Sequence, residues 1–219
     1  MSSKYPKDPQ SSTRPESSQH RDFAADAPAR STETERTRTM DSTPNAATPA
    51  PWNTRPERDD QADRAAVREV NLAAFPTSQE ADLVDALRAD PDAWLPGLSW
   101  LAQAPDGTVA GFALLTRCHV GDVPALALAP CAVLPAYQCQ GAGTAAVRAA
   151  LAAAREQGEH LVLVLGHAAY YPRFGFTPAA AYGIRPPFAV PDENMLALPL
   201  DPARPVPSGT IRYAAPFGV

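Results

Sequence analysis

Apolar residues recur three or four positions apart in two neighbouring segments of the chain, over residues 62–72 and 81–87. This spacing places apolar side chains on one face of a helix. Asp59 or Asp60 can cap the first segment, and Pro76 breaks the pattern after it. Two helices are therefore predicted, one that runs to about Ala74 and one over Gln79–Ala89.

Beyond these helices the apolar positions take the spacing of strands, with short turn sequences between them. Pro105-Asp106-Gly107 and Gly121-Asp122 are two such turns, because glycine, proline and aspartate favour turn conformations. The strand after the second turn and the run Leu161–Leu165 are nearly all apolar, which is typical of buried central strands. Strands are predicted at Trp52–Arg55, Leu98–Ala102, Val109–Cys118, Ala125–Leu134, Leu161–Leu165, Met195–Leu200 and Thr210–Tyr213.

An alanine-rich segment from Gly141 to Gln157 predicts a third helix, which Gly158 ends. A short helical turn over residues 168–174 is followed by an irregular, proline-rich stretch. The order is two helices, then a β-meander, then a strand, a helix and a strand. That order predicts a mixed α/β sheet.

The first 51 residues differ in composition from the rest of the chain. They are rich in Ser, Thr, Pro, Asp, Glu and Arg, with Phe23 as an isolated large apolar residue. Such a segment cannot bury enough apolar surface to offset its conformational entropy. We predict a disordered tail over residues 1–51 and one folded domain over residues 52–219.

The charge and the cysteine content of the chain argue against several classes of function. The net charge of -5 and a pI near 5.3 argue against a nucleic-acid partner, because phosphate contacts need a basic surface. Three cysteines, an odd number, indicate reduced thiols in a cytoplasmic protein. The sequence has no CxxC pair or HExxH motif to support a metal site, and no apolar run suited to a signal peptide or a membrane span.

The candidate chemistry lies between the strand that ends at Pro135 and the helix that begins near Gly141. The N–H groups in the first turn of a helix lack acceptors within the helix, and the helix dipole is positive at that end. Gly141 and Gly143 have no β-carbon, so an anion can approach the backbone closely. The sequence therefore predicts an anion-binding site here, without fixing which anion.

Three phosphate-binding motifs compete for this turn. A Walker loop is excluded because no lysine follows the glycines. Residues 141–146 match the dinucleotide fingerprint GxGxxA, but six residues separate Leu134 from Gly141 and no acidic residue ends the next strand. The third motif, Q-x-x-G-x-G, is typical of coenzyme A binding and is formed by Gln138, Gly141 and Gly143.

With this motif placed after the strand 131–133 and Pro135, the sequence resembles the GNAT superfamily of acetyltransferases. The resemblance implies an α/β fold with a central, mostly antiparallel sheet flanked by helices. It implies acetyl-CoA as the acyl donor, its pyrophosphate held by the loop amides of residues 138–144 and its pantetheine arm bonded to the strand edge. The residues implied to bind the cofactor are Cys131, Ala132, Val133, Gln138, Cys139, Gln140, Gly141, Ala142, Gly143 and Thr144.

A second motif, YYPRFGF over residues 170–176, resembles the family's [FY]-Y-x-x-x-G-F element and is typical of a bacterial branch. The acidic helix over residues 80–88 is similar to that branch as well, so the resemblance covers roughly Trp52 to the C-terminus. In many family members the tyrosine that aligns with Tyr171 is the general acid, and a phenol is a proton donor at neutral pH. Alternatively, Tyr171 only packs against its aromatic neighbours.

Other roles are less sharply indicated. Glu80, at the start of the second helix, is the best candidate for a general base, although an acidic residue also suits the helix dipole there. His167 ends a strand next to the expected thioester and is either a base, a cofactor contact or a polar cap. A backbone N–H of residues 131–133 is expected to meet the oxyanion. Cys131 is not expected to be a nucleophile, because an apolar strand raises a thiol pKa.

These motifs predict an N-acetyltransferase that moves the acetyl group of acetyl-CoA directly to a primary amine of a small molecule or peptide. The stretch Ala179–Asn194 mixes aromatic and acidic residues and is a candidate wall for the acceptor. Two alternatives remain: an acyl-CoA-binding module of the same fold without activity, and a nucleotide-dependent oxidoreductase. The oligomeric state, monomer or homodimer, stays open.

Overall fold

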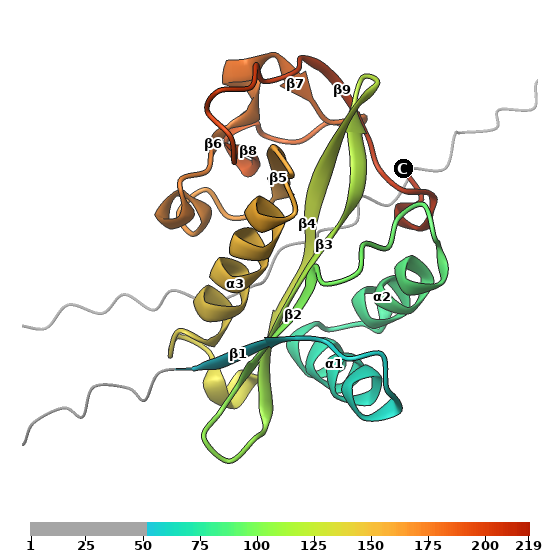
Figure 1. The fold of residues 1–219 in the computed structure, drawn as a ribbon, viewed down its shortest axis with the longest axis vertical. Coiled ribbons are helices and arrows are strands. Elements are labelled where there is room, and N and C mark those ends of the chain that lie inside the picture. The colour runs from blue at the N-terminus through green and yellow to red at the C-terminus, as the bar shows by residue number, and fades with distance from the viewer. Residues whose placement is uncertain (1–51) are drawn as a thin grey trace, which may run out of the picture.

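The computed structural model of the chain describes residues 52–219, and the predicted tail over residues 1–51 lies outside this part. In the described part, nine strands form one hydrogen-bonded sheet with helices on both faces (Figure 1). The helices are α1 (Gln61–Ala74), α2 (Gln79–Ala89) and α3 (Ala142–Glu156), with short 3-10 helices that include η2 (Tyr171–Phe174) and η5 (Ala215–Phe217). The strands are β1 (Asn53–Pro56), β2 (Ser99–Gln103), β3 (Val109–Val120), β4 (Val123–Val133), β5 (Leu161–Leu165), β6 (Thr177–Pro178), β7 (Ile184–Arg185), β8 (Met195–Pro199) and β9 (Gly209–Arg212).

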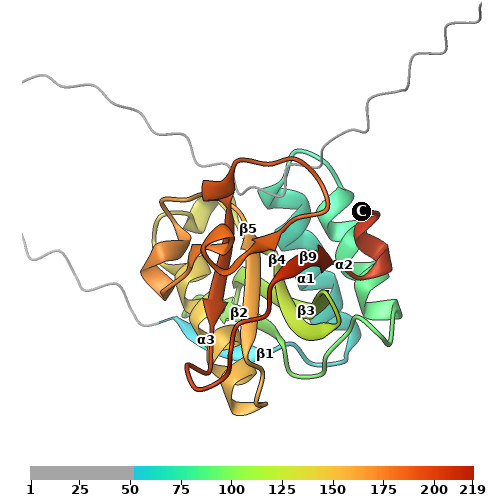
Figure 2. The same cartoon turned by 90° about the horizontal axis from the view of Figure 1, so that it is seen from above.

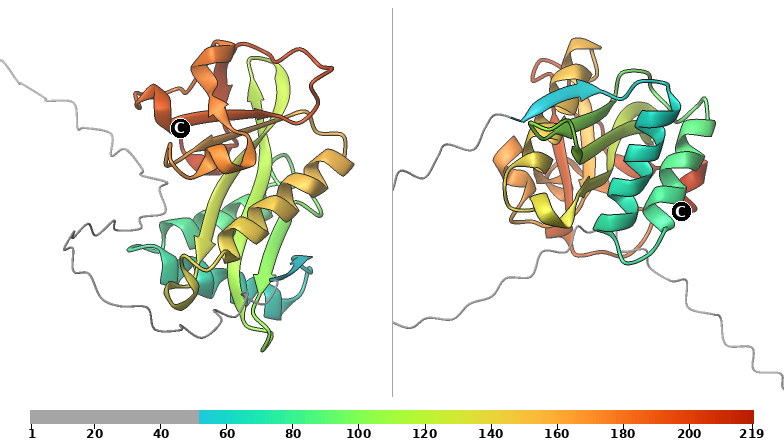
Figure 3. Two further views of the ribbon diagram at one scale, coloured as in Figure 1. Left: turned by 90° about the vertical axis from the view of Figure 1, so that its left-hand side faces the viewer. Right: turned by 90° about the horizontal axis from the view of Figure 1, so that it is seen from below.

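The strands follow the order β1-β2-β3-β4-β5-β8-β6, and β9 pairs with both β3 and β7. Neighbouring strands of the described part are antiparallel except for two parallel pairs, β4 with β5 and β7 with β9. Figure 2 and Figure 3 show α1 and α2 side by side on one face of the sheet and α3 across the other. The mixed, mostly antiparallel α/β sheet predicted from the sequence is confirmed.

Side chains of β3 alternate between two apolar cores, because successive residues of a strand point to opposite faces. Phe112 and Leu114 are buried in the core beneath α1 and α2. Ala113 and Leu115 are buried in the core beneath α3. The sheet is therefore covered on both faces, and its central strands are as apolar as the sequence indicated.

Small residues bring α3 close to the sheet. The buried side of this helix is largely alanine, including Ala146 and Ala150. At its start, a β-carbon on Gly111 of β3 would lie 3.1 Å from the carbonyl carbon of Ala142. Gly111 therefore sets how near the helix N-terminus comes to the strands that bear the candidate site.

Turn and cap residues agree with most of the predicted boundaries. Gly107 (φ +88) and Gly121 (φ +56) lie in hairpin turns, and Gly158 (φ +77) follows the end of α3. Asp60 caps α1, because its carboxylate accepts a hydrogen bond from the backbone N–H of Asp63 at 2.8 Å. β3 and β4 are longer than predicted, since they stay paired up to the Gly121 turn.

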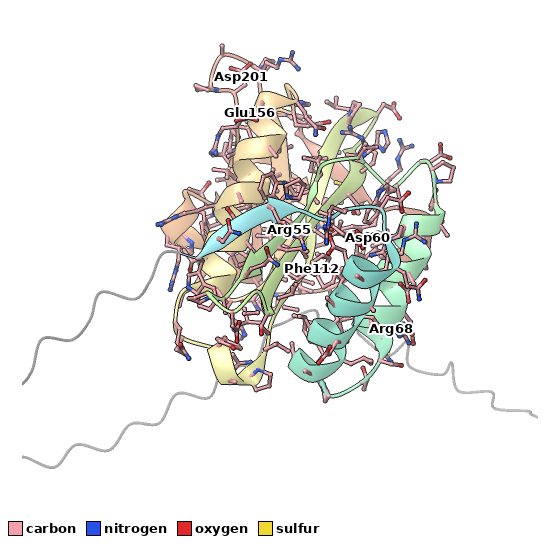
Figure 4. The ribbon with its side chains drawn as sticks, turned by 60° about the horizontal axis from the view of Figure 1, so that its bottom comes forward. Arg55, Asp60, Arg68, Phe112, Glu156 and Asp201 are labelled. Atoms are coloured by element: carbon pink, nitrogen blue, oxygen red, sulfur yellow. The ribbon has the colours of Figure 1, made fainter. Side chains whose placement is uncertain are left out.

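A buried carboxylate fastens β1 to the start of α1, where Figure 4 shows Arg55 beside Asp60. The carboxylate of Asp63 accepts hydrogen bonds from the Arg55 guanidinium at 2.7 Å and from the backbone N–H of Arg58 at 2.8 Å. The hydrogen bond from Arg55, working against the cost of burial, holds the pKa of Asp63 well below its usual range. This ion pair fixes the edge strand against the helix.

Candidate functional site

β4 and β5 separate in the middle of the sheet. They are paired at two positions, which end with Ala127 and Leu163, and beyond these β4 stays with β3 while β5 stays with β8. A bulge accompanies the separation, since Ala129 and Pro130 both lie opposite a single residue of β3. Bulges bend a strand and disrupt its pairing. The result is an opening between two parallel neighbours at their carboxyl ends.

The backbone of β4 directs hydrogen-bonding groups into this opening. The N–H of Leu134 donates to the carbonyl of Ala110 at 2.9 Å, so it points toward β3. Main-chain groups of successive strand residues point to alternate sides, and those of Cys131 and Val133 therefore point away from β3. The side-chain amide of Gln138 donates to the Val133 carbonyl at 3.4 Å. This edge can bond an extended ligand as a further strand would.

A small recess lies in the opening, and we call it the thioester recess. α2 brings Glu80 to it, β4 brings Cys131, and η2 brings Tyr171. Glu80 is 6% exposed and Tyr171 is 7% exposed, so both polar side chains are withdrawn from bulk water. The structure thus brings together the two predicted catalytic residues from distant segments. The rest of its wall is apolar: Phe75, Leu128, Ala129, Pro130 and Leu165.

Tyr171 is held by aromatic contacts and by a hydrogen bond between its side chain and that of Cys131. Its ring packs edge-on against Phe176, with centroids 5.7 Å apart, and lies directly against Gly166. Burial raises the pKa of Tyr171 well above its ordinary value and raises the pKa of the Cys131 thiol to about 12. Tyr171 is therefore a neutral hydroxyl near pH 7, and Cys131 is a thiol rather than a thiolate.

The loop between β4 and α3 is shaped by residues in the left-handed region of backbone conformation. Cys139 has φ +58 and Gly141 has φ +95, a region that glycine adopts readily and other residues seldom do. The indole N–H of Trp52 donates to the carbonyl of Gln140 at 2.9 Å and holds the loop from the side of β1. In the described part, no acceptor takes a hydrogen bond from the first-turn N–H groups of α3, on Ala142, Gly143 and Thr144.

Two arginines that the sequence analysis did not single out lie near this helix start. The Tyr170 and Thr144 hydroxyls are 3.4 Å apart, so Tyr170 joins the YYPRFGF segment to the first turn of α3. The Arg173 guanidinium lies 4.4 Å from the centre of the Tyr170 ring. Burial raises the pKa of Tyr170, while Arg173 and Arg148 act electrostatically in the opposite sense, so both cations are near its hydroxyl. Among residues 52–219, neither arginine has an acidic partner.

Two features of the sequence could have indicated these arginines. Arg148 lies one helical turn after Thr144, on the same face of α3. Arg173 is the arginine of the YYPRFGF motif. Together with the helix dipole they make this end of α3 the cationic side of the opening.

Other predicted residues lie elsewhere around the opening. The side chain of Ala132 is buried in the core beneath α1 and α2, so it can meet a ligand only through its backbone. The Gln140 side chain folds back to the carbonyl of Ala136 at 2.8 Å. His167 is exposed in the loop after β5 and does not line the thioester recess. A role for His167 stays a prediction.

In the part of the chain that the structure describes, no helix is long and apolar enough to cross a membrane. Within the same part, no group of three or more His, Cys, Asp or Glu side chains is arranged to hold a metal ion.

Comparison with known proteins identifies the family. The model of the acetyltransferase (GNAT) family matches residues 44–176, which is more than half of the chain. The chain belongs to the GNAT acetyltransferase family. The resemblance stated from the two sequence motifs is therefore confirmed.

Two Escherichia coli K12 proteins are related to this GNAT chain in sequence. The uncharacterized N-acetyltransferase YjhQ is 42% identical over 140 residues, which cover 62% of this chain and 76% of YjhQ. The uncharacterized N-acetyltransferase YhbS is 35% identical over 114 residues, which cover 51% of this chain and 66% of YhbS.

Two solved GNAT structures share the fold. The crystal structure of E. coli YhbS in complex with CoA superposes with a TM-score of 0.68 at 25% identity, over 80% of this chain and 97% of that one. A GNAT family acetyltransferase from Brucella melitensis in complex with acetyl-CoA gives a TM-score of 0.60 at 31% identity, over 76% of this chain and 97% of that one. The arrangement of helices around the sheet is thus that of GNAT enzymes.

Proposed function

We propose that this GNAT protein transfers the acetyl group of acetyl-CoA to a primary amine, directly and in a ternary complex. One observation carries the proposal. The opening between β4 and β5 has a buried tyrosine hydroxyl, that of Tyr171, in its interior and the cationic start of α3 beside it. A proton donor and an anion site on the same opening suit a long ligand that has a thioester at one end and phosphates at the other.

The helix start fits the diphosphate of acetyl-CoA. Its first-turn N–H groups and the charges of Arg148 and Arg173 would meet the phosphates. A β-carbon on Gly143 would lie 2.9 Å from a methyl carbon of Val133, so glycine lets the first turn of α3 lie close against the end of β4. The main-chain groups of Cys131 and Val133 would bond the pantetheine arm. The CoA and acetyl-CoA complexes of the two structural relatives support acetyl-CoA as the ligand.

The chemistry follows from the groups around the thioester recess. The neutral amine nitrogen attacks the thioester carbonyl carbon, and a main-chain N–H of Cys131 or Val133 stabilises the oxyanion that forms. The carbon–sulfur bond then breaks, and the Tyr171 hydroxyl gives its proton to the departing thiolate of CoA. Glu80 is the candidate acceptor of the proton that the amine loses. Cys131 remains a thiol throughout, so no acyl-enzyme forms on it.

A thiol-release assay tests the proposal. Acetyl-CoA is incubated with the full chain and a panel of primary amines, and free CoA is followed with a chromogenic disulfide. We expect amine-dependent release well above the rate of acetyl-CoA hydrolysis. If the chain binds acetyl-CoA but no amine accelerates thiol release, the alternative of an acyl-CoA-binding module without activity is correct instead.

A further inference from the structure

A second recess adjoins the thioester recess. The two recesses share Leu128, Ala129 and Leu165 in their walls. The second continues along the opening to Phe188, in the stretch that was predicted as an acceptor wall, and to Tyr213 near the C-terminus. We call it the aromatic recess.

Most of the wall of the aromatic recess lies on the face of the sheet opposite α3. Ala127, Leu163 and Phe217 belong to the core beneath α1 and α2. Two other wall residues, Leu128 and Val164, belong to the core beneath α3. Figure 2 shows the C-terminal end beside α2, on the far side of the strands from α3. A molecule in this recess therefore reaches the thioester recess from the side that the proposed cofactor does not occupy.

The walls of the aromatic recess are apolar and neutral. Phe188 and Tyr213 are stacked, with centroids 6.2 Å apart and an angle of 17° between the rings, and Phe217 packs against Tyr213 at 5.3 Å. The Tyr213 hydroxyl already donates to the sulfur of Met195 at 3.7 Å, and burial raises the pKa of Tyr213 far above its usual value. The side chains that line this recess carry no charge, and Val219, the last residue of the given sequence, lines it as well.

The charge pattern of the two recesses is uneven along the opening. The carboxylate of Glu80 lies at the thioester end, and the far end is lined by aromatic and aliphatic side chains. An ammonium buried against such surface loses its water without gaining a partner, which is costly. An apolar group buried there is stabilised by leaving water.

We propose that the acceptor is a small primary monoamine with an alkyl or arylalkyl body. Its nitrogen lies by Tyr171 and Glu80, and its uncharged body fills the aromatic recess. Polyamines, aminosugars and lysine-containing peptides are poor acceptors, because each places further polar or charged groups on the apolar wall. This inference rests on the proposed acetyl transfer and adds the class of amine to it.

A matched pair of amines tests the inference on the full chain. Hexylamine and 1,5-diaminopentane have the same number of non-hydrogen atoms, and they differ in a terminal methyl group against a second ammonium. We expect kcat/KM for hexylamine to exceed that for the diamine by about tenfold or more, since buried polar mismatches discriminate strongly. A diamine that reacts equally well or better overturns the inference while acetyl transfer itself stands. Failure of every amine to release CoA overturns both.

Two variants connect that preference to the recess. Phe188→Ala removes part of the aromatic wall and is expected to raise KM for hexylamine about tenfold, with no change in the dissociation constant for acetyl-CoA. Phe188→Asp is expected to reverse the preference toward the diamine. Tyr182→Phe is the matched control, because Tyr182 lines neither recess. Unchanged hexylamine kinetics in both Phe188 variants, with acetyl-CoA binding intact, would show that the amine body lies elsewhere.

Discussion

A β-carbon at position 166 would lie 2.3 Å from Cε2 of Tyr171, so the absence of a side chain at Gly166 lets the Tyr171 ring lie against the end of β5. The φ of Gly166 is outside the left-handed region, and its need for glycine comes from this contact alone. We predict that Gly166→Ala displaces the ring and lowers kcat about tenfold or more, as loss of a positioned group does. Steady-state kinetics with a parallel acetyl-CoA titration check this, and unchanged turnover would contradict it.

Tyr171→Phe removes the proposed proton donor and leaves the ring packing in place. We expect kcat to fall about a hundredfold, the lower end of what a general acid contributes, while the dissociation constant for acetyl-CoA stays within about twofold. Tyr182→Phe, which removes a hydroxyl bonded to Thr177, should leave both values unchanged. Wild-type turnover in Tyr171→Phe would mean that the residue only packs.

The raised pKa of Tyr171 also predicts the shape of the pH profile. A phenol is a proton donor below its pKa, and burial moves that pKa upward, so alkaline pH does not remove the donor at once. The kcat of the wild-type enzyme should therefore show no decline up to about pH 10, the usual pKa of tyrosine. A decline centred well below that pH would assign the acid role to another group.

Arg148 and Arg173 should contribute to cofactor affinity through charge. Replacement of either by Gln is expected to raise the dissociation constant for acetyl-CoA about tenfold, a typical value for a charge-assisted contact to a phosphate. The effect should shrink as salt concentration rises, because exposed charges are screened. Arg155→Gln, in the last turn of α3, is the control. Equal affinities for all three variants would remove the arginines from the proposed site.

Asp63→Asn tests the junction of β1 with α1 rather than the chemistry. Because the folded-state pKa of Asp63 is lowered, its contribution to stability is fully present above the unfolded pKa of about 4, declines below it and is lost only as pH falls through the lower folded-state pKa. We expect the variant to lose about 2 kcal/mol at pH 7, less than for a fully buried pair because Arg58 is exposed. Urea unfolding at pH 7 and pH 3 should show the gap narrowing in acid without closing, because the folded-state carboxylate is still ionised at pH 3. A gap of the same size at the two pH values would mean that the charge of Asp63 is not the cause.

Elements could be predicted from the sequence where apolar residues recur at a regular spacing and a capping or helix-breaking residue marks the end. α2 matched its predicted bounds because its apolar spacing defines it, and α1 began after Asp60 because that side chain caps it. β7 was missed, since its two residues owe their pairing to β9, far along the chain. The bulge at Ala129-Pro130 was missed as well, because nothing in a run of apolar residues marks where two strands part.

The site residues also differ in whether a local motif or the fold brings them to the site. Gln138, Gly141 and Tyr171 stand in local motifs, so their neighbourhood could be predicted one segment at a time. The place of Arg148 in the site could not be predicted, because it depends on how α3 packs against Tyr170. The aromatic recess joins Phe188 to a wall near the C-terminus and could not be read from either segment alone. Long-range packing supplied what local patterns did not contain.

The central claim is that the start of α3 and the parted strands β4 and β5 bind coenzyme A, and titration calorimetry on the full chain tests it most directly. Acetyl-CoA should bind at one site with a dissociation constant below about 1 mM, the upper end for enzyme substrates. Gly143→Ala should weaken that binding, because its β-carbon crowds Val133 and displaces the first turn of α3 from the end of β4. NADH should give no heat of binding. Association with NADH but not with acetyl-CoA would contradict the claim.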